Sequence, residues 1–93
     1  MKATFDGTTI AESDDTVVVE GNHYFPISSV RPGVLEESPH STVCPWKGTA
    51  AYYDIVIDDT TTSNGAWHYP QPSDAAAAIT DRVAFDRVVS VTP

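Results

Sequence analysis

The chain is poor in positive charge. Its 93 residues include five lysine and arginine residues against thirteen aspartate and glutamate residues, which gives a formal net charge of −8 at pH 7. A field of this sign repels phosphate polyanions and anionic lipid surfaces, and no cluster of basic residues reverses it locally. The composition therefore predicts neither nucleic-acid binding nor association with a membrane.

Cysteine and long apolar runs are also scarce. Cys44 is the only cysteine, so it has no partner for an internal disulfide, which fits a reducing compartment. The N-terminus lacks an apolar segment of signal-peptide length, and no apolar run approaches the roughly 18 residues of a membrane span. Together these absences predict a protein of the cytoplasm.

Metal ligands with recognisable spacing are missing as well. The three histidines are scattered, and none forms with Cys44 a spacing typical of zinc. Pro39 and Pro45 also exclude a continuous helix that would present His40 and Cys44 together. The five glycines are dispersed and form no phosphate-binding loop. The sequence therefore predicts neither a bound metal nor another cofactor.

The sequence does contain a series of short β-branched and aromatic segments separated by turn residues. Residues 49–57 are the strongest of these, because strict alternation places Tyr53 on one face and Tyr52 on the other. Near the N-terminus, the pair Asp6-Gly7 predicts a two-residue hairpin turn. Further strands are expected at residues 2–6, 8–11, 17–19, 23–26, 66–69, 83–85 and 87–91.

Three stretches depart from this strand pattern. Residues 27–41 are expected to be a connector, because proline and glycine interrupt them repeatedly. Residues 58–65 are expected to be a polar turn. Residues 73–82 are expected to form one short α-helix, since Ser73 can cap it and a run of alanines follows. The sequence thus predicts a single, mainly β domain over residues 1–93 with one short α-helix.

Four motifs link the chain to a known family. They are Tyr24-Phe25-Pro26, Cys44-Pro45-Trp46-Lys47-Gly48, Ala66-Trp67 and Val83-Ala84-Phe85. With them the chain resembles, almost from end to end, domain-of-unknown-function family 427, sometimes labelled nucleotidyltransferase-like. The resemblance implies a small β-tent, in which two antiparallel sheets are pinned together at one edge and leave a groove between them. Where family members usually carry a charged run after Phe-Pro, this chain has Ile27-Ser28-Ser29.

The groove is where we expect the functional site. Aromatic side chains are the usual lining of small-molecule sites, and the segment from Cys44 to Lys47 concentrates rare residue types in a turn. Lys47 supplies a cation for an anionic group of a ligand. Trp67 is expected to belong to the core instead. The predicted ligand-binding residues are Tyr24, Cys44, Trp46, Lys47, Tyr52 and Tyr69.

Three functions stay open at this point. The first is a small cytoplasmic module that binds a small molecule in the aromatic groove. The second is an enzyme that uses Cys44 or Lys47 on a small substrate, with no catalytic residue assigned. Nucleotidyl transfer is the less favoured activity, because Asp14-Asp15 and Asp58-Asp59 lie at expected turns and would not converge on one Mg²⁺. The third is a protein-interaction module that uses an exposed sheet edge or an apolar patch, and the oligomeric state is left open.

Overall fold

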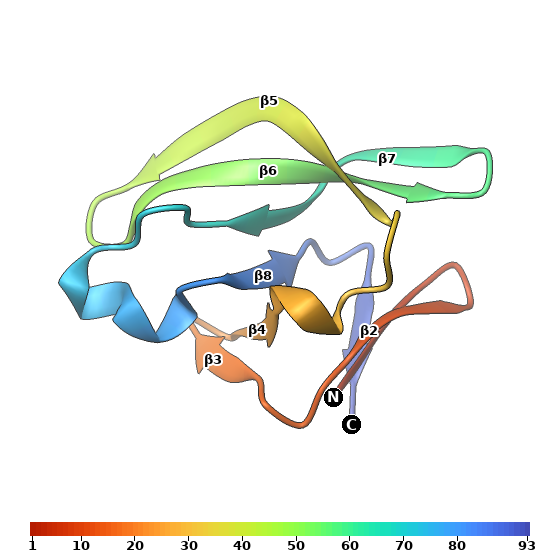
Figure 1. The fold of residues 1–93 in the computed structure, drawn as a ribbon, viewed down its shortest axis with the longest axis horizontal. Coiled ribbons are helices and arrows are strands. Elements are labelled where there is room, and N and C mark those ends of the chain that lie inside the picture. Colours follow the sequence, from red (N-terminus) through yellow and green to blue (C-terminus); the bar gives the residue numbers. More distant parts are fainter.

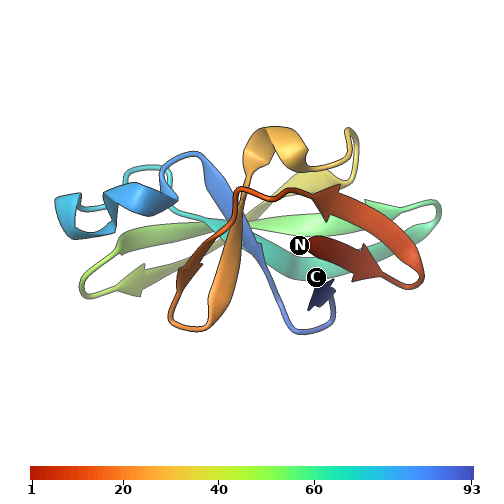
Figure 2. The same cartoon turned by 90° about the horizontal axis from the view of Figure 1, so that it is seen from below.

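The fold consists of two antiparallel sheets (Figure 1), as predicted, and the computed structural model describes all residues, 1–93. The smaller sheet has the order β2–β1–β9, with β1 at Lys2–Phe5, β2 at Thr8–Glu12 and β9 at Ser90–Thr92. The larger sheet has the order β3–β4–β8–β7–β6–β5, formed respectively by Val17–Val19, Asn22–Pro26, Arg82–Phe85, Thr60–His68, Gly48–Ile57 and Leu35–Cys44. Two short 3₁₀ segments complete the elements, η1 at Ile27–Ser29 and η2 at Asp74–Ile79. The two chain ends lie side by side (Figures 1 and 2), because β1 pairs with β9.

Two hairpins are closed by two-residue turns with a left-handed backbone. Asp6 and Gly7 have φ angles of 49° and 82°, and Glu20 and Gly21 have φ angles of 53° and 81°. Positive φ at both central residues is typical of type I′ turns, whose twist matches that of the flanking strands. The hairpin predicted at Asp6-Gly7 is confirmed. Glu20 is an unusual residue for this backbone conformation.

Two expectations about connecting segments are wrong. Residues 27–41 are not a connector throughout, because their second half belongs to the long strand β5. Pro39 is tolerated there because β5 is the outermost strand, where a missing N–H costs less than in a central strand. The turn expected over residues 58–65 is confined to Asp58-Asp59, since β7 already pairs with β6 from Thr60 onward.

The expected α-helix is a shorter 3₁₀ segment. η2 covers six residues and is kinked at Ala76, where φ is −113° and ψ is 22°. Ser73 makes no capping hydrogen bond with its side chain, and its hydroxyl donates to the carbonyl of Trp46 instead. A segment this short and uncapped does not sustain α-helical hydrogen bonding by itself. Neither helical segment of the structure has the length or the apolar character to cross a membrane.

The hydrogen-bond register of β6 is interrupted on both sides, by β5 and by β7, near the same residues of β6. In the pairing of β5 with β6, the register shifts between Glu37 and Ser41 of β5. In the pairing of β6 with β7, the register shifts between Tyr53 and Ile55 of β6. Figure 1 shows β5 arching away from β6 over this stretch. Such bulges bend a strand and increase its local twist.

Polar contacts tie these two irregular segments together. The hydroxyl of Ser38 in β5 donates to the side-chain oxygen of Asn64 in β7 at 2.6 Å. The backbone N–H of Asn64 in turn donates to the carboxylate of Asp54 in β6 at 2.9 Å. Gly65 lies beside them and leaves room for Ile55, since a Cβ at this position would lie 2.6 Å from Cδ1 of Ile55 and would force that side chain to shift. We call the two tied segments, at Ser38 in β5 and Asn64 in β7, the coupled bulges.

Apolar side chains fill both faces of the larger sheet. The inter-sheet core lies between the two sheets and contains Ala3, Ile10, Ala11, Phe25, Val34, Ile55, Ala66, Val83, Phe85 and Val89. The aromatic core lies against η2 and contains Tyr24, Ala50, Tyr69, Ala76, Ile79 and Ala84. Strand alternation produces this division, since Tyr24 and Phe25 are adjacent in β4 and enter different cores.

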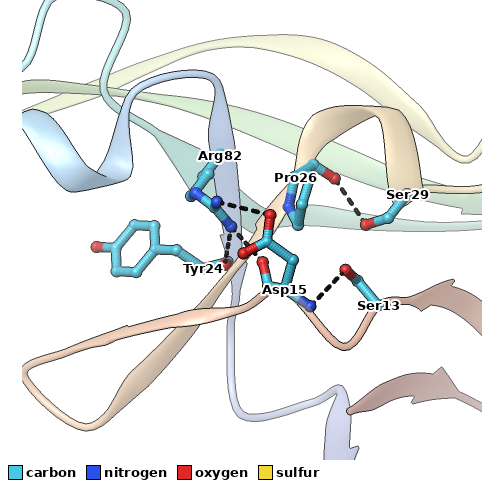
Figure 3. A network of polar contacts seen from close by, with 6 residues as sticks. All are labelled: Ser13, Asp15, Tyr24, Pro26, Ser29 and Arg82. Carbon is cyan, nitrogen blue, oxygen red and sulfur yellow. Dashed lines mark hydrogen bonds and ion pairs between the residues drawn. The ribbon is translucent and has the colours of Figure 1, made fainter.

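A largely buried arginine ties the β2–β3 loop to the larger sheet (Figure 3). Arg82 in β8 donates from its guanidinium to the backbone carbonyls of Asp15 and Tyr24, and its Nη2 lies 3.2 Å from Oδ2 of Asp15. The backbone N–H of Asp15 also donates to the hydroxyl of Ser13 at 2.9 Å. Asp15 is therefore a partner of Arg82 and more than a solvated turn residue.

Replacing Arg82 tests how much this contact holds the fold together. We expect Arg82→Ala to lower the free energy of unfolding by about 1–3 kcal/mol, because hydrogen bonds from a charged donor are lost at a largely buried position. Arg87→Ala is the matched control, and as an exposed substitution it should change stability by less than about 0.5 kcal/mol. Urea denaturation followed by circular dichroism measures both, and equal losses would contradict the assignment.

Candidate functional site

The turn between β5 and β6, residues 45–47, is anchored by contacts with residues outside the hairpin. Gly48 has a φ of 118° and lies close to the backbone of Gln71. A Cβ at Gly48 would lie 3.2 Å from the carbonyl oxygen of Gln71. The N–H of Ser73 donates to the carbonyl of Lys47 at 2.9 Å, and its hydroxyl donates to the preceding carbonyl of the turn. These contacts fix the turn against the segment that leads into η2.

Lys47 points inward from this turn, against the behaviour of most lysines. Its side chain is only 7% exposed, and its ammonium forms an ion pair with Glu20. The nitrogen lies 5.4 Å from the ring centroid of Trp46 and 5.3 Å from that of Tyr69, within the range of cation–π attraction. The turn therefore holds a buried cation between two aromatic rings.

Glu20 supplies the anion from a distant part of the chain. It lies 27 residues before Lys47, in the left-handed turn between β3 and β4, and its side chain is 52% exposed. The sequence analysis did not assign Glu20 to the site. A single acidic residue beside Gly21 is an ordinary sequence feature, so the sequence carried no signal for this pairing.

The protonation equilibria of the site follow from these contacts. Burial opposes the charged form of Lys47, but the hydrogen bond to Glu20 and neighbouring groups outweigh it and raise the pKa of Lys47. The same hydrogen bond lowers the pKa of Glu20. Burial raises the pKa of Tyr69, and backbone N–H groups of the following turn lower the pKa of the Cys44 thiol. At neutral pH the site thus contains a lysine cation, a glutamate anion and neutral Tyr69.

The six predicted site residues lie around the aromatic core, but in different settings. Tyr24 and Tyr69 are buried members of that core, and the hydroxyl of Tyr24 accepts a hydrogen bond from the Trp67 indole at 3.2 Å. Cys44 is half-buried against the same core. Trp46 is 42% exposed beside buried Lys47. The rings of Tyr24 and Tyr69 thus pack in the protein interior, and Trp46 is the most solvent-exposed aromatic residue of this group.

Tyr52, the remaining predicted residue, lies to the side of this group. It packs against the aromatic core with its ring centroid 6.3 Å from that of Trp67, and its hydroxyl lies 3.1 Å from Oγ1 of Thr42. His40 meets the same ring edge-on at 4.6 Å. Of the six predicted residues, Tyr52 alone lines one of the surface hollows.

That hollow opens where β5 lifts away from β6. It has a volume of about 360 Å³. On its wall the His68 ring stacks on Tyr53, with centroids 4.7 Å apart and planes inclined by 18°. The sequence analysis missed this feature, because Glu37 and Ser38 fell inside the expected connector. Its lining consists of Glu37, Ser38, Ala51, Tyr52, Tyr53, His68 and Pro70.

Comparison with known families agrees with the resemblance seen in the sequence motifs. A family model described as a domain of unknown function (DUF427), labelled NTP_transf_9, matches residues 1–92. The chain belongs to the DUF427 family. No curated protein matches this DUF427 chain.

The nucleotidyltransferase label would imply a Mg²⁺ ion held by carboxylates. In this DUF427 chain no group of three or more histidine, cysteine, aspartate or glutamate side chains is placed to hold a metal ion. Asp15, from one of the two adjacent aspartate pairs, is instead bound to Arg82. The residues present therefore do not fit the metal that the label implies.

The setting of His68 predicts a pH response. Burial disfavours the imidazolium and lowers the pKa of His68 below its ordinary value of 6.5, while the Glu37 carboxylate opposes this shift. His68 therefore contributes stability above pH 6.5 that is lost as the pH falls through its folded-state pKa. Glu37→Gln should move the His68 midpoint to still lower pH, as followed by NMR of the imidazole Cε1 proton.

Glu36→Gln is the matched control for this titration. Neighbouring residues of a strand point to opposite faces, so loss of the Glu36 charge should leave the His68 midpoint nearly unchanged. A midpoint at or above 6.5 in the unsubstituted protein would contradict the assignment. So would an upward movement of the midpoint in Glu37→Gln.

Proposed function

We propose that this DUF427 domain acts in the cytoplasm and binds a small anionic molecule at Lys47. The observation that carries the proposal is the pairing of a buried ammonium with an exposed carboxylate, since the side chain of Lys47 is 7% exposed and that of Glu20 is 52% exposed. The presence of a single cysteine supports the cytoplasmic location.

The ion pair is open to solvent on its anionic side. Burying an ammonium group costs free energy, and the hydrogen bond with Glu20 offsets that cost although the Glu20 side chain is 52% exposed. Glu20 sits in a two-residue turn, so its carboxylate can give way to an anionic group of similar size. We therefore regard Glu20 as occupying the position that the ligand takes.

The surroundings of Lys47 favour a small, flat ligand with one negative charge. Trp46 is 42% exposed and can offer its indole face to a planar ring while the anionic group meets Lys47. The net charge of −8 disfavours ligands that carry several negative charges. A planar monocarboxylate satisfies both conditions.

Benzoate is the probe for this proposal. We expect it to shift the indole N–H signal of Trp46 saturably in NMR titrations, whereas neutral benzamide should leave that signal in place. The signal is assigned with a Trp46→Phe variant. Because Glu20 competes with the ligand, Glu20→Gln should bind benzoate about tenfold more tightly, which corresponds to about 1.4 kcal/mol.

Lys47→Met is the variant that should abolish benzoate binding. Methionine keeps most of the side-chain volume beside Tyr69, so the fold survives the substitution better than with alanine. Lys2→Met removes an exposed lysine and is the matched control. If benzoate fails to move the Trp46 signal even in Glu20→Gln, or if Lys47→Met binds it equally well, the proposal is wrong.

Cysteine chemistry at Cys44 is a second candidate function, favoured by one observation. Backbone N–H groups at Trp46 and Lys47 lower the pKa of the thiol, which raises the fraction of reactive thiolate. No side-chain base is hydrogen-bonded to Cys44, so the thiol would depend on the turn and on Lys47 for its activation.

Alkylation by iodoacetamide tests this candidate. The rate should rise with a midpoint below the ordinary thiol pKa, because the turn stabilises the thiolate. Lys47→Met should move the midpoint upward, since the ammonium charge also lowers the pKa of Cys44, whereas Lys2→Met should not. A midpoint at the value of free cysteine would leave Cys44 with a packing role only.

A further inference from the structure

The hollow beside β5 is built by the main chain. Its lining comes from the raised segment of β5, from β6 and from the end of β7, and the coupled bulges hold the β5 segment in place. Ser38, one of its lining residues, is held from both sides, because its hydroxyl donates to Asn64 at 2.6 Å and accepts from the N–H of His40 at 3.1 Å. The opening therefore does not depend on the rotamer of one surface side chain.

Aromatic rings dominate the walls of this hollow. Tyr52 and Tyr53 are both lining residues, but their side chains leave β6 on opposite faces and pack against different cores. His68 adds a third ring, stacked on Tyr53. The faces of such rings are electron-rich and attract cations.

The charges around the hollow have one sign. Glu37 is its only lining residue with a formal charge at neutral pH, because burial keeps His68 and Tyr53 in their neutral forms. Glu36 and Asp54 lie on the same two strands. No lysine or arginine lines the hollow, and the whole chain carries a net charge of −8. An anion is repelled here and a cation is attracted.

We propose that this hollow binds a small organic cation, an alkylated ammonium group that contacts the stacked rings of Tyr53 and His68 and pairs with the carboxylate of Glu37. A volume of about 360 Å³ fits a small molecule of this kind. The site lies apart from Lys47 and selects the opposite charge. Cation binding in the hollow is therefore independent of anion binding at Lys47, and an experiment can contradict one proposal without contradicting the other.

Choline is the probe, and its neutral carbon analogue, in which carbon replaces the ammonium nitrogen, is the matched ligand control. NMR titration follows the imidazole signal of His68 and the ring signals of Tyr53. Choline should shift them saturably, and the analogue should not. Absence of a saturable shift, or equal binding of the neutral analogue, would overturn the proposal.

Two variants test whether the carboxylate of Glu37 is the negative charge that attracts choline. Glu37→Gln should weaken choline binding about threefold to fivefold, the size expected for an ion pair with an exposed carboxylate. Glu36→Gln removes the neighbouring charge with the same chemistry and should weaken binding by less than about twofold. Equal effects of the two substitutions would show that only the general acidity of the chain attracts choline, and would overturn the assignment to the hollow. Unchanged benzoate binding in Glu37→Gln confirms that the Lys47 site is intact.

Discussion

The coupled bulges on the two sides of β6 are the constraint on which the shape of this molecule depends. In a regular antiparallel sheet, β5 would stay within ladder distance of β6 along its whole length, and no hollow would form between them. Extra residues in β5 and β7 bend both strands at one level, and the bond between Ser38 and Asn64 holds the two bends together. The absence of a side chain at Gly65 leaves room for Ile55 beneath them.

Packing on both faces of the larger sheet determines where polar chemistry can occur. The inter-sheet core covers part of one face and the aromatic core part of the other, and no buried polar side-chain atom is left without a hydrogen-bond partner. Polar groups meet aromatic rings at a strand end, where Lys47 pairs with Glu20, and at the raised edge, where Glu37 lies beside Tyr53. The candidate site at Lys47 thus lies at the end of a strand, and the candidate site at Glu37 lies where β5 bends.

Local patterns in the sequence predicted a large part of this arrangement. Alternation placed Tyr52 and Tyr53 on opposite faces, and they pack against different cores. The predictions failed where a residue acts through distant neighbours. Pro39 looked like a chain breaker because its place at the sheet edge depends on strand order. The pairing of Glu20 with Lys47 spans 27 residues, and no local pattern encodes it.

The candidate sites at Lys47 and in the hollow differ in charge, and Tyr52 is in contact with the surroundings of both. Two of the five basic residues are engaged internally, Lys47 by Glu20 and Arg82 by Asp15, so little positive charge is left to offset the acidic surface near the raised edge. The cation proposed for the hollow and the anion proposed at Lys47 are thus ligands of opposite charge. Tyr52 lines the hollow and also packs against the aromatic core beside Trp67.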